Sequence, residues 1–158
     1  MNFEQMQLQR AFGCFQTGQL NEAARLFREI LQTNKKNYFA LHFLGLIEFS
    51  HGDQAEGLKL LKDSLKITPM NIQFVENYVS ALFKAERFSD ALEMSEYGLR
   101  HANGNRDLLY IKAVSTFKLE KYEESLKCYD VLLAEQADNF HWLSERAAVL
   151  SDCLLYTS

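Results

Sequence analysis

The sequence predicts an all-α protein, an α-solenoid in which antiparallel pairs of helices stack along the chain. Two observations predict it: a constant period of 34 residues, and apolar residues at helical spacing inside each period. Asparagine recurs at Asn37, Asn71, Asn105 and Asn139. Phenylalanine recurs at Phe15, Phe49, Phe83 and Phe117. Stacked repeats present an extended surface, so we expect a surface site rather than an enclosed one.

The period divides the chain into four full units and a partial fifth, at 4–37, 38–71, 72–105, 106–139 and 140–152. The second unit shows the pattern most clearly. A first helical face is formed by Leu41, Leu44 and Ile47. A second follows at Leu58, Leu61 and Leu65. Because Gly52 interrupts the pattern and Pro69 ends it, we expect two helices of about 13 residues in each full unit.

The ends of these helices carry recognisable signals. Each recurring asparagine precedes the leading helix of the next unit, where its side chain can accept a hydrogen bond from a free helix N–H. The turn inside each unit falls at Gly18, Gly52, Glu86 and Glu120. Glutamate adopts the left-handed conformation less easily than glycine does. We therefore expect the last two turns to avoid positive φ.

Small residues recur in both helices of a unit. The leading helices carry Ala11, Gly45, Val79, Ala113 and Ala147. The trailing helices carry Ala23, Gly57, Ala91 and Ser125. Facing small residues let two helices approach closely, while a bulky neighbour fills the adjacent space. We expect the two helices of each unit to be in close contact at these positions.

These residues resemble a known family. The pattern Leu41-x-x-Leu44-Gly45, Gly57-x-x-x-Leu61 and Pro69 is similar to the tetratricopeptide repeat, and Ala23-x-x-x-Phe27 matches it in the first unit. The resemblance covers residues 4–152. It implies a right-handed superhelix of about nine helices, with the leading helices on the concave side.

Composition narrows the function. The net charge of −4 argues against a nucleic-acid partner, and 47% hydrophobic residues with 24% charged ones are typical of a soluble globular protein. Cys14 and Cys128 lie far apart and the four histidines are scattered, so we expect no disulfide framework, no metal and no cofactor. The chain begins without a signal peptide pattern, and its most apolar stretch is about half the length that spans a bilayer. We expect a cytoplasmic protein with no membrane partner.

The sequence favours a protein-interaction scaffold without catalytic activity. It contains no Gly-rich phosphate loop, no His-Glu-x-x-His motif and no nucleophile elbow. If the leading helices line the concave face, they would bind a peptide or helix of a partner protein. The candidate binding residues are Phe12, Phe15, Phe39, His42, Leu46, Phe49, Glu76, Phe83, Lys84, Tyr110, Phe117 and Lys118. For the recurring phenylalanines a second interpretation stays open, because their rings could instead pack between neighbouring helices.

An alternative concerns a longer parent protein. The stretches 18–23 and 40–47 resemble the opening of bacterial multi-domain proteins, some of which end in a glycosyltransferase domain. The resemblance implies that the array could be the substrate-presenting amino-terminal arm of a truncated enzyme, most plausibly an O-linked N-acetylglucosamine-type glycosyltransferase. The intact gene would then encode a nucleotide-sugar-binding domain downstream.

The last six residues, 153–158, have a separate interpretation. They look like a reading frame through the transposon end used in shotgun libraries, whose codons TGT CTC TTA TAC ACA TCT would encode them. The alternative is an ordinary end of an amphipathic helix. We expect residues 153–158 to be a sequencing-adapter scar and the natural gene to continue past Asp152. The fifth unit has a leading helix and no trailing one, so its outer face would be exposed and could support self-association of two copies.

Overall fold

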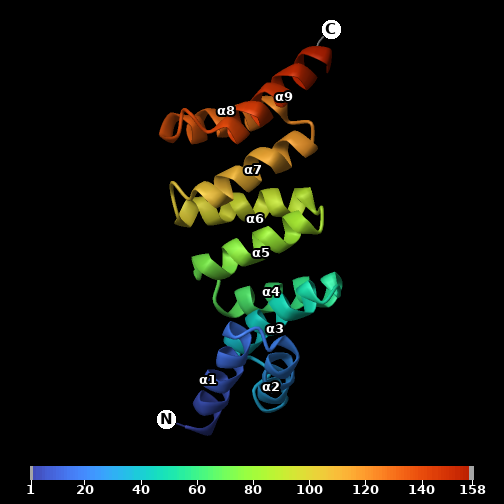
Figure 1. The fold of residues 1–158 in the computed structure, drawn as a ribbon, viewed down its shortest axis with the longest axis vertical. Coiled ribbons are helices and arrows are strands. Elements are labelled where there is room, and N and C mark those ends of the chain that lie inside the picture. Colours follow the sequence, from blue (N-terminus) through green and yellow to red (C-terminus); the bar gives the residue numbers. More distant parts are fainter. Residues whose placement is uncertain (1, 157–158) are drawn as a thin grey trace. The chain divides into compact units, whose positions relative to one another are not determined.

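The computed structural model describes residues 2–156, which form nine α-helices and no strand. The helices are α1 (Phe3–Gln16), α2 (Leu20–Thr33), α3 (Tyr38–Ser50), α4 (Gln54–Ile67), α5 (Ile72–Lys84), α6 (Phe88–His101), α7 (Arg106–Lys118), α8 (Tyr122–Glu135) and α9 (Phe140–Tyr156) (Figure 1). Eight of them have 13 or 14 residues, as the sequence predicts. The prediction of an all-α protein with about nine helices is confirmed.

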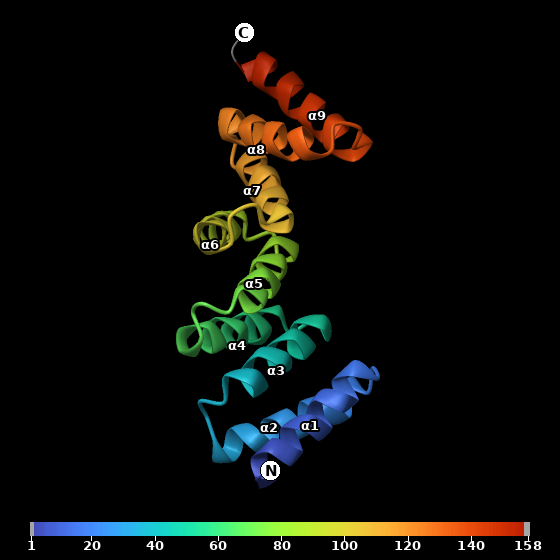
Figure 2. The same ribbon diagram turned by 90° about the vertical axis from the view of Figure 1, so that its left-hand side faces the viewer.

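The chain forms two compact units, Met1–Ala81 and Leu82–Ser158. The first contains α1 to α4 and most of α5. In it α1 contacts α2, α2 contacts α3, and α3 contacts α4 (Figure 2). The second contains the end of α5 and α6 to α9, and there α6 contacts α7, α7 contacts α8, and α8 contacts α9. Contacts between consecutive helices are the rule in repeat proteins.

The four recurring asparagines cap the helices that follow them. Asn37 Oδ1 accepts a hydrogen bond from the backbone N–H of Ala40 at 2.9 Å, and Asn105 Oδ1 accepts one from Leu108 at 3.0 Å. Asn71 and Asn139 accept the equivalent bonds at 3.2 Å. Each cap satisfies one of the N–H groups that an α-helix leaves free at its start. The predicted caps are confirmed.

The prediction that the last two turns avoid positive φ is wrong. Glu86 has φ of 56° and Glu120 has φ of 60°, the same left-handed region that Gly18 occupies at 77° and Gly52 at 100°. Hydrogen bonds account for this. The N–H of Arg87 donates to the carbonyl of Leu82 at 2.9 Å and that of Lys121 to Thr116 at 2.8 Å, closing the end of the helix as in a Schellman motif. These bonds require a left-handed residue, whichever side chain stands there.

Small residues bring the two helices of a unit together, as predicted. A Cβ atom added at Gly45 of α3 would lie 3.0 Å from the carbonyl oxygen of Gly57 and from Leu61 of α4. One added at Gly57 would lie 2.7 Å from the backbone nitrogen of Phe49. In the fourth repeat, 106–139, Ser125 Oγ donates a hydrogen bond to the carbonyl of Ala113 at 2.8 Å. The core of each unit therefore sits between its leading and trailing helices.

The last helix is longer than the others. α9 has 17 residues and continues to Tyr156, four residues past the predicted end of the fifth unit at 152. Leu154 stands one period after Glu120, at the position where earlier repeats have their left-handed residue. In α9, however, the helix continues through this position. Residues 157 and 158 of the predicted adapter scar lie outside the described part of the chain. The assignment of 153–158 as a scar stays a prediction.

Among the residues described, no helix combines the length and the apolar character that crossing a membrane requires.

Candidate functional site

An apolar pocket of the first compact unit, Met1–Ala81, lies between α1 and the start of α3. Its volume is about 260 Å³, and its lining is mostly apolar. Residues of α1 and of the start of α3 line it: Leu8, Gln9, Phe12, Asn37, Tyr38 and Phe39. Two of the predicted binding residues, Phe12 and Phe39, therefore lie together. A concave, mostly apolar site with a few polar groups is the usual form of a binding pocket.

A polar clasp fixes the start of α3 beside the start of α1. Glu4 Oε1 accepts a hydrogen bond from the side-chain amide of Asn34 at 2.9 Å and another from that of Asn37 at 2.6 Å. Asn37 at the same time caps α3 through its side-chain oxygen. One carboxylate therefore holds both ends of the link between α2 and α3. This sets the distance between the two walls of the pocket.

The two phenylalanines that line the pocket, Phe12 and Phe39, belong to a larger cluster of aromatic rings. The ring of Phe12 lies 5.4 Å from that of Phe39 and 5.0 Å from that of Phe43, both edge to face. Phe43 also lies 6.0 Å from Phe27, a fully buried residue of α2. Edge-to-face pairs stabilise a cluster beyond the burial of its area. Phe12 and Phe39 stay half-buried, so each has one side in the core and one side toward the pocket.

His42 is not on the surface, contrary to its predicted place in the binding face. Its side chain is fully buried and its ring stacks on that of Phe74, with centroids 3.6 Å apart. The side-chain nitrogen of Asn77 lies 2.9 Å from Nε2, while Nδ1 has no hydrogen-bond partner among the described residues. Burial lowers the pKa of His42 to about 4, so the ring is neutral at pH 7. His42 therefore packs in the core, against the rings of Phe43 and Phe74, and not on the binding surface.

The recurring phenylalanines are half-buried, and each packs near the turn of its own helix pair. Phe83 lies 5.8 Å from Phe88 and Phe117 lies 6.1 Å from Tyr122, in both cases across the turn. Phe49 packs where Gly57 leaves room for it. Phe15 alone contacts a ring of a neighbouring leading helix, Phe43, at 5.0 Å. Both interpretations of these rings, core and binding surface, therefore stay open.

The remaining predicted residues do not join the pocket. Leu46 and Glu76 are half-buried in the first unit, whereas Lys84 and Lys118 are exposed in the second. Tyr110 belongs to a separate polar cluster with Glu145, Tyr129 and His141. Its hydroxyl donates to Glu145 at 3.2 Å, and burial together with this carboxylate raises the pKa of Tyr110 to about 12. The hydroxyl of Tyr129 donates to the other oxygen of the same carboxylate at 2.8 Å.

Sequence reasoning left Gln9, Asn37 and Tyr38 out of the binding face. The sequence pattern identifies Asn37 only as a cap, and Tyr38 follows it as the first residue of α3. The helical face pattern of the second repeat begins after Asn37 and Tyr38, so periodicity carries no signal for these two residues. A useful signal would have been the position of Tyr38 directly after a cap, because first-turn side chains project past the helix end.

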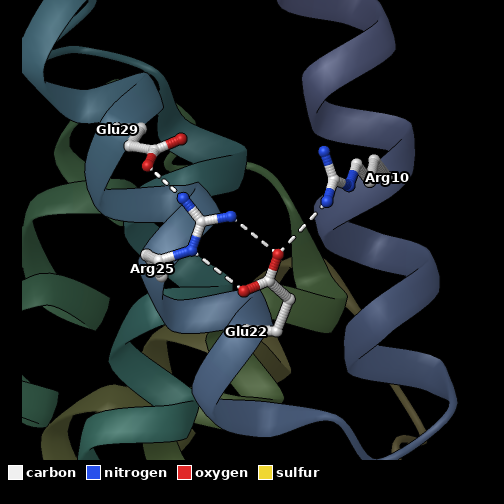
Figure 3. Close-up of polar contacts among 4 residues, drawn as sticks. All are labelled: Arg10, Glu22, Arg25 and Glu29. Carbon is white, nitrogen blue, oxygen red and sulfur yellow. Dashed lines mark hydrogen bonds and ion pairs between the residues drawn. The ribbon is translucent and has the colours of Figure 1, made fainter.

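A charged network joins α1 to α2 on the outside of the first unit (Figure 3). Arg25 of α2 pairs with Glu22 at 2.7 Å and also with Glu29, and Arg10 of α1 reaches Glu22 at 3.3 Å. The hydrogen bond from Arg25 lowers the pKa of Glu22. All four side chains are exposed to solvent, so the network contributes little to stability.

The described residues contain no group of three or more His, Cys, Asp or Glu side chains that could hold a metal ion.

Comparisons with known proteins agree on the fold. No family model matches the chain, and no curated protein sequence matches it. Solved structures do. MamA from Desulfovibrio magneticus superposes with a TM-score of 0.83 at 16% identity, over 94% of this chain and 85% of that one. A tetratricopeptide repeat protein from Parabacteroides merdae gives 0.82 at 19%, over 92% of this chain and 58% of that one. This chain has the tetratricopeptide-repeat fold.

A third similar structure is an enzyme. The O-GlcNAc transferase of Thermobaculum terrenum matches with a TM-score of 0.70 at 15% identity, over 85% of this chain but only 27% of that one. At such identities the similarity concerns the fold alone.

Proposed function

We propose that this chain is a protein-interaction scaffold whose pocket between α1 and α3 binds an apolar side chain of a partner peptide or helix. The observation that carries the proposal is the pocket itself, about 260 Å³ in volume and walled by half-buried phenylalanines. Tetratricopeptide repeats present such surfaces on their leading helices. The chain itself performs no chemistry in this proposal.

The pocket has the features of an anchor site. Tyr38 is 43% exposed at its edge, and aromatic residues of this kind dominate the energetics of protein interfaces. Gln9 is exposed on the facing wall, where its amide can donate to and accept from a peptide backbone. Because Glu4 fixes the wall positions in advance, little ordering is required on binding.

The partner extends beyond the anchor in our proposal. Within Met1–Ala81, Leu46, Glu76, Phe15 and Phe49 are half-buried, so a segment bound there would meet ring edges and aliphatic side chains. Lys84 and Lys118 are exposed and would favour acidic residues in the partner. Self-association and a cytoplasmic location stay part of this proposal. An enzyme parent stays the alternative, and sequencing downstream of Asp152 would decide it.

The test selects peptides from a random displayed library on the chain, immobilised through its carboxyl end. We expect the selected peptides to share a large apolar residue and to bind the free chain in solution. Replacing Tyr38 by Ala should weaken their binding by about tenfold, because an exposed ring at the pocket edge is removed.

The control is Phe3→Ala. Phe3 is also an aromatic first residue of a leading helix, is 71% exposed and does not line the pocket. This variant should bind the peptides as the natural chain does. Equal losses in both variants, or no loss in either, would contradict the placement of the site.

A further inference from the structure

The first compact unit, Met1–Ala81, has a second and larger cavity, an open groove lined by α2, α3 and α4. Its volume is about 580 Å³, and its lining also includes Lys35 in the link between α2 and α3. Pockets that enclose a drug-sized ligand have volumes of about 300–1,000 Å³. The groove therefore has room for several side chains of a partner.

Three leucines make up the apolar part of the lining, one from each helix. Leu31 of α2 is half-buried, and Leu44 of α3 and Leu60 of α4 are buried. An apolar side chain that enters the groove would therefore leave water for an aliphatic surface, which is favourable in proportion to the area buried.

An ion pair fixes the arginine of the groove. Nη2 of Arg28 donates a hydrogen bond to Oε1 of Glu48 in α3, whose side chain is only 15% exposed. Within residues 2–156 this is the only hydrogen bond of the Arg28 guanidinium. Because a guanidinium has five N–H donors, most of them are left for a ligand, and the pair with Glu48 holds them in place before binding.

The charges of the lining leave one cation without a partner. Arg28 is paired with Glu48, and Glu56 of α4 is paired with Lys59 at 3.3 Å. Lys35 is exposed and forms no ion pair with any residue that the structure describes. The groove therefore carries a positive charge that an acidic ligand would neutralise.

We propose that this groove binds a segment of a partner protein in which an acidic residue lies beside a large apolar one. The carboxylate pairs with Lys35, next to the part of α2 where Arg28 and Gln32 supply further N–H donors. The apolar side chain packs against the three leucines. Recognition of acidic segments by basic side chains is a common mode of peptide binding.

The groove and the pocket between α1 and α3 are separate sites. They share no lining residue. The described lining of that pocket contains no charged side chain, whereas the groove is lined by two cations and two carboxylates. This proposal therefore does not rest on the function proposed for the pocket, and variants that change only one lining distinguish the two.

The test selects short peptides from a random displayed library on the Tyr38→Ala chain, which lacks the exposed ring at the edge of the other pocket. We expect the selected peptides to combine Asp or Glu with a large apolar residue. Their binding to the natural full chain, followed by fluorescence anisotropy, should be saturable. Replacing the acidic residue of a peptide by its amide, or the apolar residue by Ser, should each weaken binding by about tenfold.

Two neighbouring lysines supply a matched pair of variants. Lys35→Glu reverses the unpaired charge of the groove and should weaken binding by about tenfold or more. Lys36→Glu makes the same change on an exposed residue that does not line the groove, and it should leave binding almost unchanged. A peptide with Lys in place of its acidic residue should bind the Lys35→Glu chain better than the natural chain, because the pair is restored with its signs exchanged.

Three outcomes would overturn the proposal, once circular dichroism has shown that the variants are folded. The first is that no selected peptide binds saturably. The second is an equal loss in Lys35→Glu and Lys36→Glu, which would mean that the net charge of the chain, and not the groove, attracts the peptides. The third is a set of selected peptides without an acidic residue, which would mean that apolar contact alone selects them.

Discussion

Glutamate at positions 86 and 120 occupies a backbone conformation that most side chains avoid, and the chain accepts it because the helix end must close. The left-handed residue allows the N–H groups of Arg87 and Lys121 to reach carbonyls five residues back. A glutamate in this region costs more than a glycine would. The preference of one residue is thus overridden by the hydrogen bonds of a repeated turn.

Replacing Glu86 by Gly should stabilise the protein. We expect the free energy of unfolding in urea to rise by about 0.5–1 kcal/mol, because glycine enters positive φ without steric strain. The control is Glu93→Gly, an exposed position inside α6, which should lower stability by about the same amount. Destabilisation by both variants would show that the Glu86 side chain makes a compensating contact.

His42 should make stability depend on pH. Its pKa in the folded chain is about 4, below the 6.5 of the unfolded chain, so the unfolded chain takes up the proton first as pH falls. The stability that the neutral ring provides is complete above pH 6.5 and is lost as pH falls from about 6.5 to about 4. The full loss is about 3 kcal/mol.

The measurement is the unfolding free energy across this window for the natural chain and for His42→Phe, which keeps an aromatic ring against Phe74. We expect the slope between pH 6.5 and 4 to be smaller in the variant. His51→Ala, at an exposed position, should keep the natural slope. An unchanged slope in His42→Phe would mean that other groups cause the dependence.

At the scale of the helix pair, close approach through small residues determines how tightly each unit packs. Gly57 of α4 meets the backbone of Phe49 in α3, and Ser125 of α8 meets that of Ala113 in α7. Helix propensity alone would favour larger residues at both places. The contact between helices therefore decides the residue, and the cost within the helix is accepted.

Two glycines inside helices of the first unit should respond in opposite ways to alanine. Gly57→Ala places a Cβ atom 2.7 Å from the backbone of Phe49 and should lower the free energy of unfolding by about 1–3 kcal/mol. Gly13→Ala adds a Cβ with nothing within 4 Å and should raise it by about 0.5–1 kcal/mol. Thermal and urea unfolding would measure both. Stabilisation by Gly57→Ala would contradict the close contact of α3 and α4.

At the scale of the whole molecule, the nearest-neighbour contacts limit how far a local change spreads. Helices in each unit contact mainly the next helix along the chain. In such arrays stability is close to a sum of local terms, and parts of the chain open separately. A substitution in one unit should therefore leave distant helices almost unchanged.

Hydrogen exchange of Gly57→Ala tests this locality. We expect faster amide exchange in α3 and α4, which lose their contact, and a smaller change in α2, which packs on α3. Exchange in α8 should stay as in the natural chain. Uniform acceleration along all described helices would instead indicate that the chain unfolds as one cooperative body.

The fold could be predicted from the sequence much better than the site. Asn105 and its three equivalents mark where helices begin, and Gly45 with Gly57 marks where they touch, because both effects act between positions at fixed spacing. The turn at Glu86 was predicted wrongly because the closing hydrogen bonds are invisible in residue preferences. His42 was placed on the surface because periodicity gives a direction around the helix, whereas the stacking of Phe74 on the ring decides its burial.

The clasp at Glu4 has a practical consequence. One carboxylate in the first turn of the chain holds both Asn34 and Asn37, and Asn37 is part of the pocket wall. Fusing a tag or dye to the amino end, or trimming that end by a few residues, would disturb the wall before any ligand arrived. Proteins prepared for binding measurements should keep Glu4, leave the amino end free of additions and carry their labels elsewhere.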